Sequence, residues 1–437
     1  MFLKIYNYLF KSYHRPSAKI LHFIILFKSI FFNKKTEIMS EKMMLLKNPP
    51  ISVIFYNSLG RLLILIANSV FIILFNKFFE SKIVIDSIEN KKNINLKGNN
   101  LTPWPLQAMH VFENIKDVDD NTFDLIEKNY QLTVNSLSKH NRFKDSPWWI
   151  ECREEFKKIF INNNLINRNE FKNFRNNKNT KAALLADQSY FKGNILSRFN
   201  KFKSLSLINL YHKLSTKIDI NILRSCSESY SGKSYALNYR GQRLSHRVLR
   251  YAYYTSQLKK YVNFSNDRTI ILDLGGGYGG LSRMLKNEFK NATFIIIEIP
   301  EVCAFAHYFL QNNFPESKIG SYQNFLNLKT VHQSDLKQFD FVILPQTMIE
   351  KFDDAIIDLS INTTSLGEMT NEVQDYYLVQ LERITKKYFY SVNRAESRSD
   401  KYNAQGFYDL NFSSRWKSLI YKFSHTYHIE FLGEKND

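Results

Sequence analysis

The carboxyl-terminal third of the chain predicts a doubly wound α/β fold with a mostly parallel sheet, and three observations lead to that class. A short apolar run at 270–274 is followed by a glycine-rich turn and then by apolar residues at helical spacing. Short apolar runs and amphipathic segments then alternate as far as Val392, which is the pattern of repeated βαβ units. Polar residues follow the ends of these runs, where open parallel sheets bind their ligands.

Charge and composition divide the 437 residues into three regions. The formal net charge of +19 comes from residues 1–80 and 81–260, which carry +8 and +15, whereas residues 261–437 carry −4. We therefore expect a hydrophobic, basic segment at 1–80, a mainly helical, substrate-side region at 81–260 and the α/β domain at 261–437. With 44% hydrophobic and 23% charged residues, wholesale disorder is excluded.

Two apolar runs, Ile20–Phe32 and Leu62–Phe75, characterise residues 1–80. Each is shorter than the roughly 20 residues that a spanning helix needs. Three interpretations stay open: a weak membrane span or hairpin, a pair of helices on the membrane surface, or ordinary buried helices. The flanking lysines suit an anionic cytoplasmic leaflet, so we expect an anionic membrane surface as a partner of this segment.

The three cysteines are too far apart in sequence for a disulfide framework or a CxxC-type zinc site. We therefore expect a reducing compartment: the cytoplasm, or the inner face of the cytoplasmic membrane. We expect no required metal, because no Asp/His set has metal-ligand spacing.

The helical region contains two informative segments. Ser146 followed by proline predicts a helix start. A longer helix is expected over Gln242–Val262, where Arg243, Arg247 and Arg250 would share one face. That face either contacts an anion or is a solvated basic surface.

The glycine turn permits two cofactor interpretations. Gly275, Gly277 and Gly280 satisfy the dinucleotide pattern GxGxxG. Asp273, Gly275, Gly277 and Gly279 also satisfy the DxGxGxG loop of S-adenosylmethionine (SAM) methyltransferases. The acidic residue discriminates, because a carboxylate there would repel a pyrophosphate but suits the ammonium group of a methionine moiety.

Polar residues end the other predicted strands as well. Glu298 closes the strand Thr293–Ile297, and a carboxylate there can accept both ribose hydroxyls of either cofactor. Further strands are expected at 341–344, Ile356–Ile361 and Tyr388–Val392, with a helix capped by Thr370 that ends at Lys386 and Lys387. The residues at the strand ends are Asp273, Glu298, Gln346, Asn362 and Asn393. After Trp416 the chain leaves little room for both final strands of a seven-stranded sheet, so we expect His425–Leu432 to supply one.

The segment 271–394 resembles the sugar O-methyltransferases of bacterial surface-polysaccharide loci. The matching stretches are Asp273–Gly279, Glu298-Ile299-Pro300-Glu301, Asn362–Met369 and Tyr390–Arg394, and the similarity extends over about 225–432. Glu298 replaces the commoner aspartate and keeps the carboxylate. The resemblance implies a Rossmann-like class I fold, SAM as cofactor and methyl transfer to a sugar hydroxyl. The residues expected to bind the cofactor are Asp273, Gly275, Gly277, Gly279, Glu298 and Gln346.

Methyl transfer to a sugar hydroxyl benefits from a base that takes the hydroxyl proton. Glu368 is the first candidate, and its alternative is a carboxylate that only favours a helix N-terminus. His307 lies in an amphipathic segment and is expected to pack. The residues expected to contact the substrate are Glu228, His246, Asn362, Asn393 and Arg394; for Arg394 the alternative is a loop ion pair.

Three functions remain open at this level. The leading hypothesis is a SAM-dependent O-methyltransferase that acts on a sugar or glycan precursor in cell-surface polysaccharide biosynthesis. The basic surplus raises a second, a nucleic-acid methyltransferase, but no recognised binding module accompanies the charge, and we do not expect nucleic acid as a partner. The third is a non-catalytic, membrane-associated binding protein on a methyltransferase fold.

Overall fold

The computed structural model describes residues 84–85, 107–108, 117–138, 145–162, 165–175, 207–208, 210–234, 236–239, 241–264, 267–395, 403–424 and 428–436. The apolar runs predicted within residues 1–80, and the membrane contact expected of them, lie outside the described residues. Among the helices of the described ranges, none is both long and apolar enough to cross a membrane.

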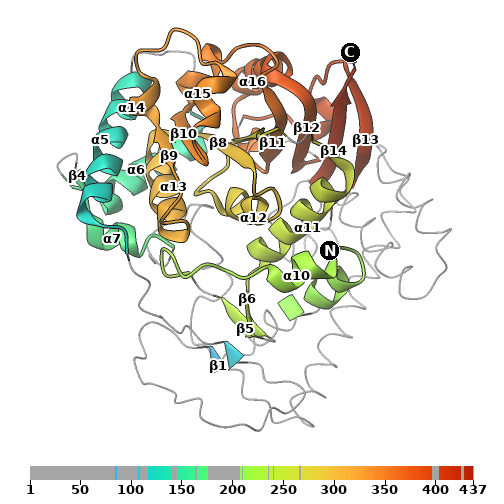
Figure 1. The fold of residues 1–437 in the computed structure, drawn as a ribbon, viewed down its shortest axis with the longest axis horizontal. Helices are drawn as coiled ribbons and strands as arrows, with labels where there is room; N and C mark the ends of the chain where they lie inside the picture. Colours follow the sequence, from blue (N-terminus) through green and yellow to red (C-terminus); the bar gives the residue numbers. More distant parts are fainter. Residues whose placement is uncertain are drawn as a thin grey trace, which may run out of the picture. The chain divides into compact units, whose positions relative to one another are not determined.

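Eight strands form one sheet in the order β13-β14-β12-β11-β7-β8-β10-β9 (Figure 1). If the edge strand β9 is set aside and the others are numbered along the chain from β7, the order is 6-7-5-4-1-2-3. This is a Rossmann-like, class I methyltransferase sheet, as the sequence predicts.

The chain divides into two compact units, which are described separately. The glycine-loop unit consists of the described residues between Phe79 and Phe143 and between Ile150 and Asp358. The carboxyl-terminal unit consists of the described residues of 145–149 and 359–436.

Parallel strands form the sheet of the glycine-loop unit. In spatial order they are β7 (Thr269–Leu274), β8 (Ala292–Glu298), β10 (Phe341–Pro345) and β9 (Ile319–Ser321). All residues of β7 and β10 are buried, as continuous apolar runs in a parallel sheet should be. Leu274 lies opposite Ile297, and Pro345 lies opposite Glu298, so the three strands end at one edge. The short strand β9 was not predicted.

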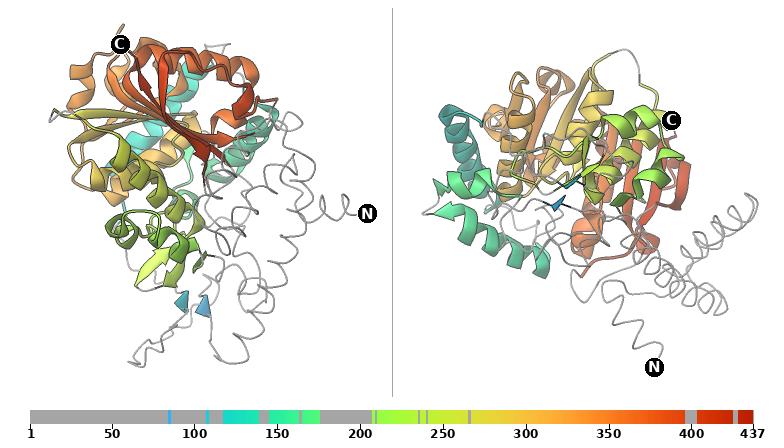
Figure 2. Two further views of the ribbon diagram at one scale, coloured as in Figure 1. Left: turned by 90° about the vertical axis from the view of Figure 1, so that its right-hand side faces the viewer. Right: turned by 90° about the horizontal axis from the view of Figure 1, so that it is seen from below.

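The carboxyl-terminal unit ends in an antiparallel hairpin, contrary to the expectation that little room was left after Trp416. Its strands are β11 (Ile357–Thr363), β12 (Thr385–Arg394), β13 (Trp416–Phe423) and β14 (His428–Lys435). β14 pairs antiparallel with both β12 and β13, and these strands lie side by side (Figure 2). Both final strands fit because consecutive antiparallel strands need only a short connection, whereas parallel strands need a crossover.

Helices accompany the parallel strands of the glycine-loop unit. α12 (Gly280–Glu288) follows the glycine turn directly, and α13 (Pro300–Asn313) follows β8 with proline at its start. α11 (His246–Tyr261) packs against α12. The predicted apolar stripe of α12 is buried at Leu281, Met284 and Leu285.

The prediction of a helix over Gln242–Val262 is wrong for its first turn. Gln242–Leu244 forms strand β6, which pairs with β5 (Leu237–Tyr239), and α11 begins only after Ser245. The reason is a cap: the Ser245 side chain accepts a hydrogen bond from the backbone N–H of Val248 at 3.0 Å. Arg243 therefore does not share a helical face with Arg247 and Arg250.

The helices that precede the sheet strands in sequence are held by aromatic packing. Phe305 of α13 stacks on Phe171 and Phe174, with ring centroids 4.4 and 4.9 Å apart, and meets Phe160 edge-on at 5.0 Å. The helices concerned are α5 (Asp120–Leu137), α6 (Pro147–Phe160) and α7 (Arg168–Lys172). α6 begins after Ser146 as predicted, and α5 packs on α13 (Figure 1).

In the carboxyl-terminal unit, α16 (Asn371–Ile384) follows Thr370, which occupies the N-cap position without a side-chain cap bond. Lys386 and Lys387 belong to β12 and not to the last helical turn, because the chain is already extended at β-branched Thr385, the residue that follows the helix. The remaining elements are β1 (Val84–Ile85), β2 (Gln107–Ala108), β3 (Ile161–Asn162), β4 (Leu165–Ile166), α10 (Ile220–Ser225), α14 (Tyr322–Phe325), α15 (Gln333–Lys337), η1 (Gln346–Lys351), η2 (Leu366–Glu368) and η3 (Phe407–Asp409).

All three cysteines lie in the glycine-loop unit as buried free thiols: Cys152, Cys226 and Cys303. Burial raises the pKa of Cys226 to about 12 and raises the pKa of Cys303 well above its ordinary value. No disulfide framework was expected, and these thiols are free.

Candidate functional site

The glycine turn between β7 and α12 has a backbone that favours glycine. Gly275, Gly277 and Gly279 have φ angles of +68°, +59° and +85°, in the left-handed region. Gly276 has an additional steric reason, because a Cβ there would lie 2.8 Å from the carboxyl group of Asp273. The turn therefore places half-buried glycine backbone directly over a buried carboxyl group.

That carboxyl group is the most unusual feature of the turn. Asp273 is 1% exposed, and neither of its oxygens has a hydrogen-bond partner in normal geometry among the described residues. Burial, followed by the charge of Glu298, raises the pKa of Asp273 to about 8, although the nearby Ser282 hydroxyl acts in the opposite direction. A buried, unpaired acid is costly in the folded chain, and a cationic ligand would relieve that cost.

Glu298 ends β8 beside the turn, as predicted. Its Oε1 accepts a hydrogen bond from the backbone N–H of Gly277 at 2.8 Å, and its Oε2 accepts one from Ile299 at 3.0 Å. A carboxylate oxygen has more than one acceptor position, so these bonds orient the group and still allow it to accept from a ligand hydroxyl.

Gln346 completes the residues expected to bind the cofactor. It is buried and comes directly after Pro345, the register partner of Glu298. The structure thus brings Asp273, the turn glycines, Glu298 and Gln346 to one edge of the glycine-loop unit, where strands β7, β8 and β10 end.

The strand-end asparagines of the carboxyl-terminal unit bind each other. Nδ2 of Asn393 donates to Oδ1 of Asn362 at 2.8 Å and to Oγ of Ser391 at 2.9 Å, while Nδ2 of Asn362 donates to Oγ of Ser365 at 2.6 Å. Oδ1 of Asn393 is buried and has no hydrogen-bond partner within the described ranges. The amides brace the ends of β11 and β12.

Glu368 and Arg394, the expected base and a substrate contact, also lie together. Glu368 ends η2 and is 7% exposed. Its Oε1 lies 3.5 Å from Nη2 of Arg394. The loop ion pair considered for Arg394 is thus present, with Glu368 as its partner.

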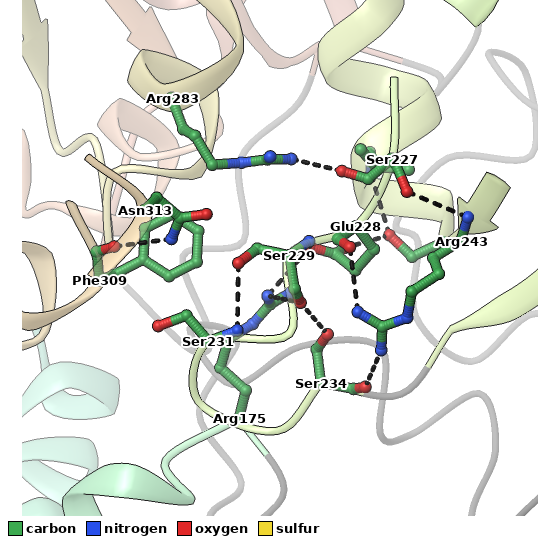
Figure 3. A network of polar contacts seen from close by, with 12 residues as sticks. Arg175, Ser227, Glu228, Ser229, Ser231, Ser234, Arg243, Arg283, Phe309 and Asn313 are labelled. Atoms are coloured by element: carbon green, nitrogen blue, oxygen red, sulfur yellow. Dashed lines mark hydrogen bonds and ion pairs between the residues drawn. The ribbon is translucent and has the colours of Figure 1, made fainter. Parts of the chain in front are cut away.

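Glu228, a further expected substrate contact, is buried in a polar network within the glycine-loop unit (Figure 3). Its Oε1 forms an ion pair with Nη1 of Arg175 at 2.9 Å, and its Oε2 accepts a hydrogen bond from Oγ of Ser245 at 2.6 Å. Burial opposes its ionisation, but the charge of Arg175 and the hydrogen bonds from Arg175 and Ser245 outweigh burial and lower the pKa of Glu228 to about 2.

His246 was expected to contact the substrate and His307 to pack in a helix. His246 begins α11, directly after the Ser245 that bonds to Glu228, and is half-buried. His307 lies in α13 at 3% exposure, and burial lowers its pKa to about 4. That position agrees with the expectation that His307 packs.

Sequence reasoning missed two arginines that belong to the network around Glu228. Arg175 follows α7, and Arg283 lies in α12, so neither shares an element with Glu228. Arg283 donates to the carbonyl oxygen of Ser227 at 2.5 Å. No local spacing signal connects these residues, since only the tertiary fold brings them together.

No family model matches the chain, and no curated protein matches it significantly. Solved structures resemble parts of it weakly. The mitomycin 7-O-methyltransferase MmcR has 13% identity over 59% of this chain and 76% of its own, with a TM-score of 0.32. A SAM-dependent methyltransferase from Aquifex aeolicus has 12% identity over 41% and 89%, with a TM-score of 0.28. A structure titled as a putative sarcosine dimethylglycine methyltransferase from Galdieria sulphuraria has 12% identity over 44% and 87%, with a TM-score of 0.31.

Superpositions at this level carry no argument about activity. The fold class rests instead on the strand order, on the parallel register of β7, β8 and β10, and on the antiparallel strand β14. By these features the chain has the Rossmann-like fold of the class I methyltransferases.

Proposed function

We propose that the chain is a SAM-dependent O-methyltransferase whose acceptor is a hydroxyl of a sugar or glycan precursor. One observation carries the cofactor assignment: the buried carboxyl group of Asp273, which has no hydrogen-bond partner in normal geometry in the described part of the chain, lies under a glycine turn at the end of β7. Its position suits the ammonium group of the methionine moiety. Glu298 at the neighbouring strand end suits the two ribose hydroxyls.

The residues at this edge offer the cofactor a buried carboxyl group at Asp273, a turn of glycine backbone and a second carboxylate at Glu298. Bound SAM supplies a methyl group that is already activated on sulfonium. The chain therefore has to orient the acceptor and receive its proton, and alignment alone provides a large part of such an acceleration. In this proposal Gln346 helps to hold the cofactor, and Glu368 takes the proton from the acceptor hydroxyl.

The sugar acceptor rests on the resemblance of Asn362–Met369 and Tyr390–Arg394 to the sugar O-methyltransferases. Asn362, Asn393 and Arg394 offer amide and guanidinium groups of the kind that bind sugar hydroxyls and anionic substituents. Their mutual bonds would have to open or share donors when an acceptor binds.

The decisive experiment has two stages. Isothermal titration of the full chain with SAM and with S-adenosylhomocysteine should show binding of both; a folded chain that binds neither contradicts the proposal. Tritiated methyl transfer from SAM is then measured with sugar nucleotides, polysaccharide extracts, DNA and RNA. Label in the sugar fractions supports the proposal, whereas label confined to nucleic acid overturns the acceptor class.

We also propose that residues 1–80 attach the enzyme to an anionic membrane surface on the cytoplasmic side. The net charge of +8 and the two apolar runs support this. The full chain should sediment with phosphatidylglycerol vesicles and much less with phosphatidylcholine vesicles. Equal recovery in the supernatant with both would contradict the attachment.

A further inference from the structure

The polar network of the glycine-loop unit contains more positive than negative groups. Arg175, Arg243 and Arg283 approach the loop 227–234 from three directions (Figure 3). Glu228 is the one carboxylate with which a member of this arginine cluster (Arg175, Arg243 and Arg283) forms an ion pair among the described residues. Three guanidinium groups therefore face a single negative charge.

Within the described ranges, the hydrogen bonds of two members of the arginine cluster go to neutral oxygens only. Arg243 donates to the carbonyl oxygens of Glu228 at 3.0 Å and of Ser234 at 2.8 Å, and its guanidinium carbon lies 3.7 Å from the ring centroid of Tyr230. Arg283 donates to the carbonyl oxygen of Ser227. Burial lowers the pKa of Arg243 to about 10 and also lowers the pKa of Arg283. Within the described part of the chain neither charge forms an ion pair of its own, as buried cations normally do, and both share the charge of Glu228 with Arg175.

Several donors of the cluster are also unused. The atoms concerned are buried and have no hydrogen-bond partner among the residues that the structure describes: Nε and Nη2 of Arg175, Nε of Arg243, Nε of Arg283 and Oγ of Ser231. Arg175 is 0% exposed and Arg243 is 3% exposed, so water does not readily replace the missing partners. Arg283 is half-buried, so it is less shielded from solvent than Arg175 and Arg243.

The arginine cluster adjoins the cofactor turn. The guanidinium carbon of Arg175 lies 4.6 Å from the ring centroid of Tyr278, a residue of that turn, and Arg247 lies over the same ring at 5.5 Å. Arg283 belongs to α12, which begins at the end of the turn. An anion held here is therefore next to the elements that would hold the methyl donor.

We infer that the arginine cluster binds an oxyanion of the acceptor, so that the substrate class is an anionic sugar, with a phosphate or a carboxylate substituent, in place of a neutral one. Guanidinium groups match both oxyanions because they donate two parallel hydrogen bonds. The inference rests on the proposed function for the acceptor's identity as a sugar, whereas anion binding itself does not depend on SAM.

The test is a titration of the full chain, without SAM, with glucose 1-phosphate, glucuronate and glucose. At least one of the two anions should bind at least tenfold more tightly than glucose, and raised salt should weaken that binding. A comparison of glucose 1-phosphate with glucuronate shows whether the preferred oxyanion is a phosphate or a carboxylate. If neither anion binds more tightly than glucose, the inference is overturned.

Variants locate the site. Arg283→Gln should weaken binding of the preferred anion at least tenfold, and Arg283→Lys should recover part of it. Arg224→Gln removes the same charge from an exposed position on α10 of the same unit and should leave the affinity within twofold. Equal affinities of Arg283→Gln and Arg224→Gln would overturn the assignment to the cluster.

Failure of this inference and failure of the proposed function give different results. A chain that binds SAM but neither anion loses only the anionic acceptor. A chain that binds an anion through Arg283 but does not bind SAM keeps the anion site and loses the methyltransferase proposal.

Discussion

Two buried carboxyl groups of the glycine-loop unit, Asp273 and Glu228, have opposite environments. Asp273 lies under the glycine turn with no hydrogen-bond partner in normal geometry among the residues described, and its pKa is raised to about 8. Glu228 lies among arginines with partners on both oxygens, and its pKa is lowered to about 2. Burial alone therefore does not determine the charge of an acid; its partners do. Among the described residues, the first region holds an acid with no cationic partner, and the second holds more guanidinium groups than carboxylates.

The largest expected effect is on stability, at Glu228. Glu228→Ala leaves the buried Arg175 guanidinium without its counter-ion, so the free energy of unfolding should fall by about 3–5 kcal/mol. Unfolding of the variant and the wild type in guanidinium chloride measures this difference in the free energy of unfolding. Glu316→Ala, at an exposed position, is the control and should change stability by less than about 0.5 kcal/mol. A loss below 1 kcal/mol at Glu228, on the order of a single ordinary hydrogen bond, would mean that the ion pair matters little.

Asp273 should show the reverse pattern, with a small effect on stability and a large effect on ligand binding. Asp273→Asn should weaken SAM binding at least a hundredfold in isothermal titration, which is about 2.7 kcal/mol. The fold should be retained and should gain stability relative to the wild type as pH rises, because the wild-type acid binds its proton more tightly when folded than when unfolded. If the affinity of Asp273→Asn for SAM equals that of the wild type, the contrast between a ligand-binding Asp273 and a stabilising Glu228 is wrong.

The pH dependence of SAM binding follows from the same acid. Below its pKa of about 8 in the ligand-free chain, Asp273 must release a proton before it can pair with an ammonium group. The affinity should therefore rise by up to about tenfold per pH unit between pH 6 and 8 and then level off. The slope should be absent in Asp273→Asn. Titration in two buffers of different ionisation enthalpy would reveal the released proton.

The smallest effect on stability is expected at Ser245. Its substitution removes one hydrogen-bond partner of Glu228 and so sharpens the comparison of Glu228 with Asp273. Ser245→Ala deletes the hydrogen bond to Oε2 of Glu228 and the cap of α11. The expected loss is about 1–2 kcal/mol, with a cap contribution of about 1 kcal/mol. Ser245→Asp keeps a capping side chain but brings a like charge to Glu228, and should be less stable than Ser245→Ala. The opposite order would mean that only the cap matters.

Acid titration offers an independent check on Glu228. A carboxyl group with a lowered folded-state pKa stabilises the fold fully above its unfolded value near 4.5, and this contribution is lost as pH falls towards about 2. Glu228→Gln should lack that part of the acid dependence while remaining folded at neutral pH.

Local patterns were sufficient to predict the central strands and the glycine turn. The strands 269–274, 292–298 and 341–345 follow apolar runs, and Glu298 was placed by its position at a strand end. The arginine cluster could not be predicted in this way, because Arg175, Glu228 and Arg283 come from separate segments that only tertiary packing joins. At Gln242–Val262 the helical spacing continues through Ser245, but the cap of that serine stops the helix there.

The buried cysteines give the chain a built-in reporter of local opening. Cys152, Cys226 and Cys303 all belong to the glycine-loop unit, and the raised pKa values of Cys226 and Cys303 suppress the reactive thiolate. Alkylating reagents should therefore modify these thiols only during excursions that expose them. The labelling rate of each cysteine, measured by mass spectrometry with and without a ligand, would report how far that ligand slows local opening of the glycine-loop unit.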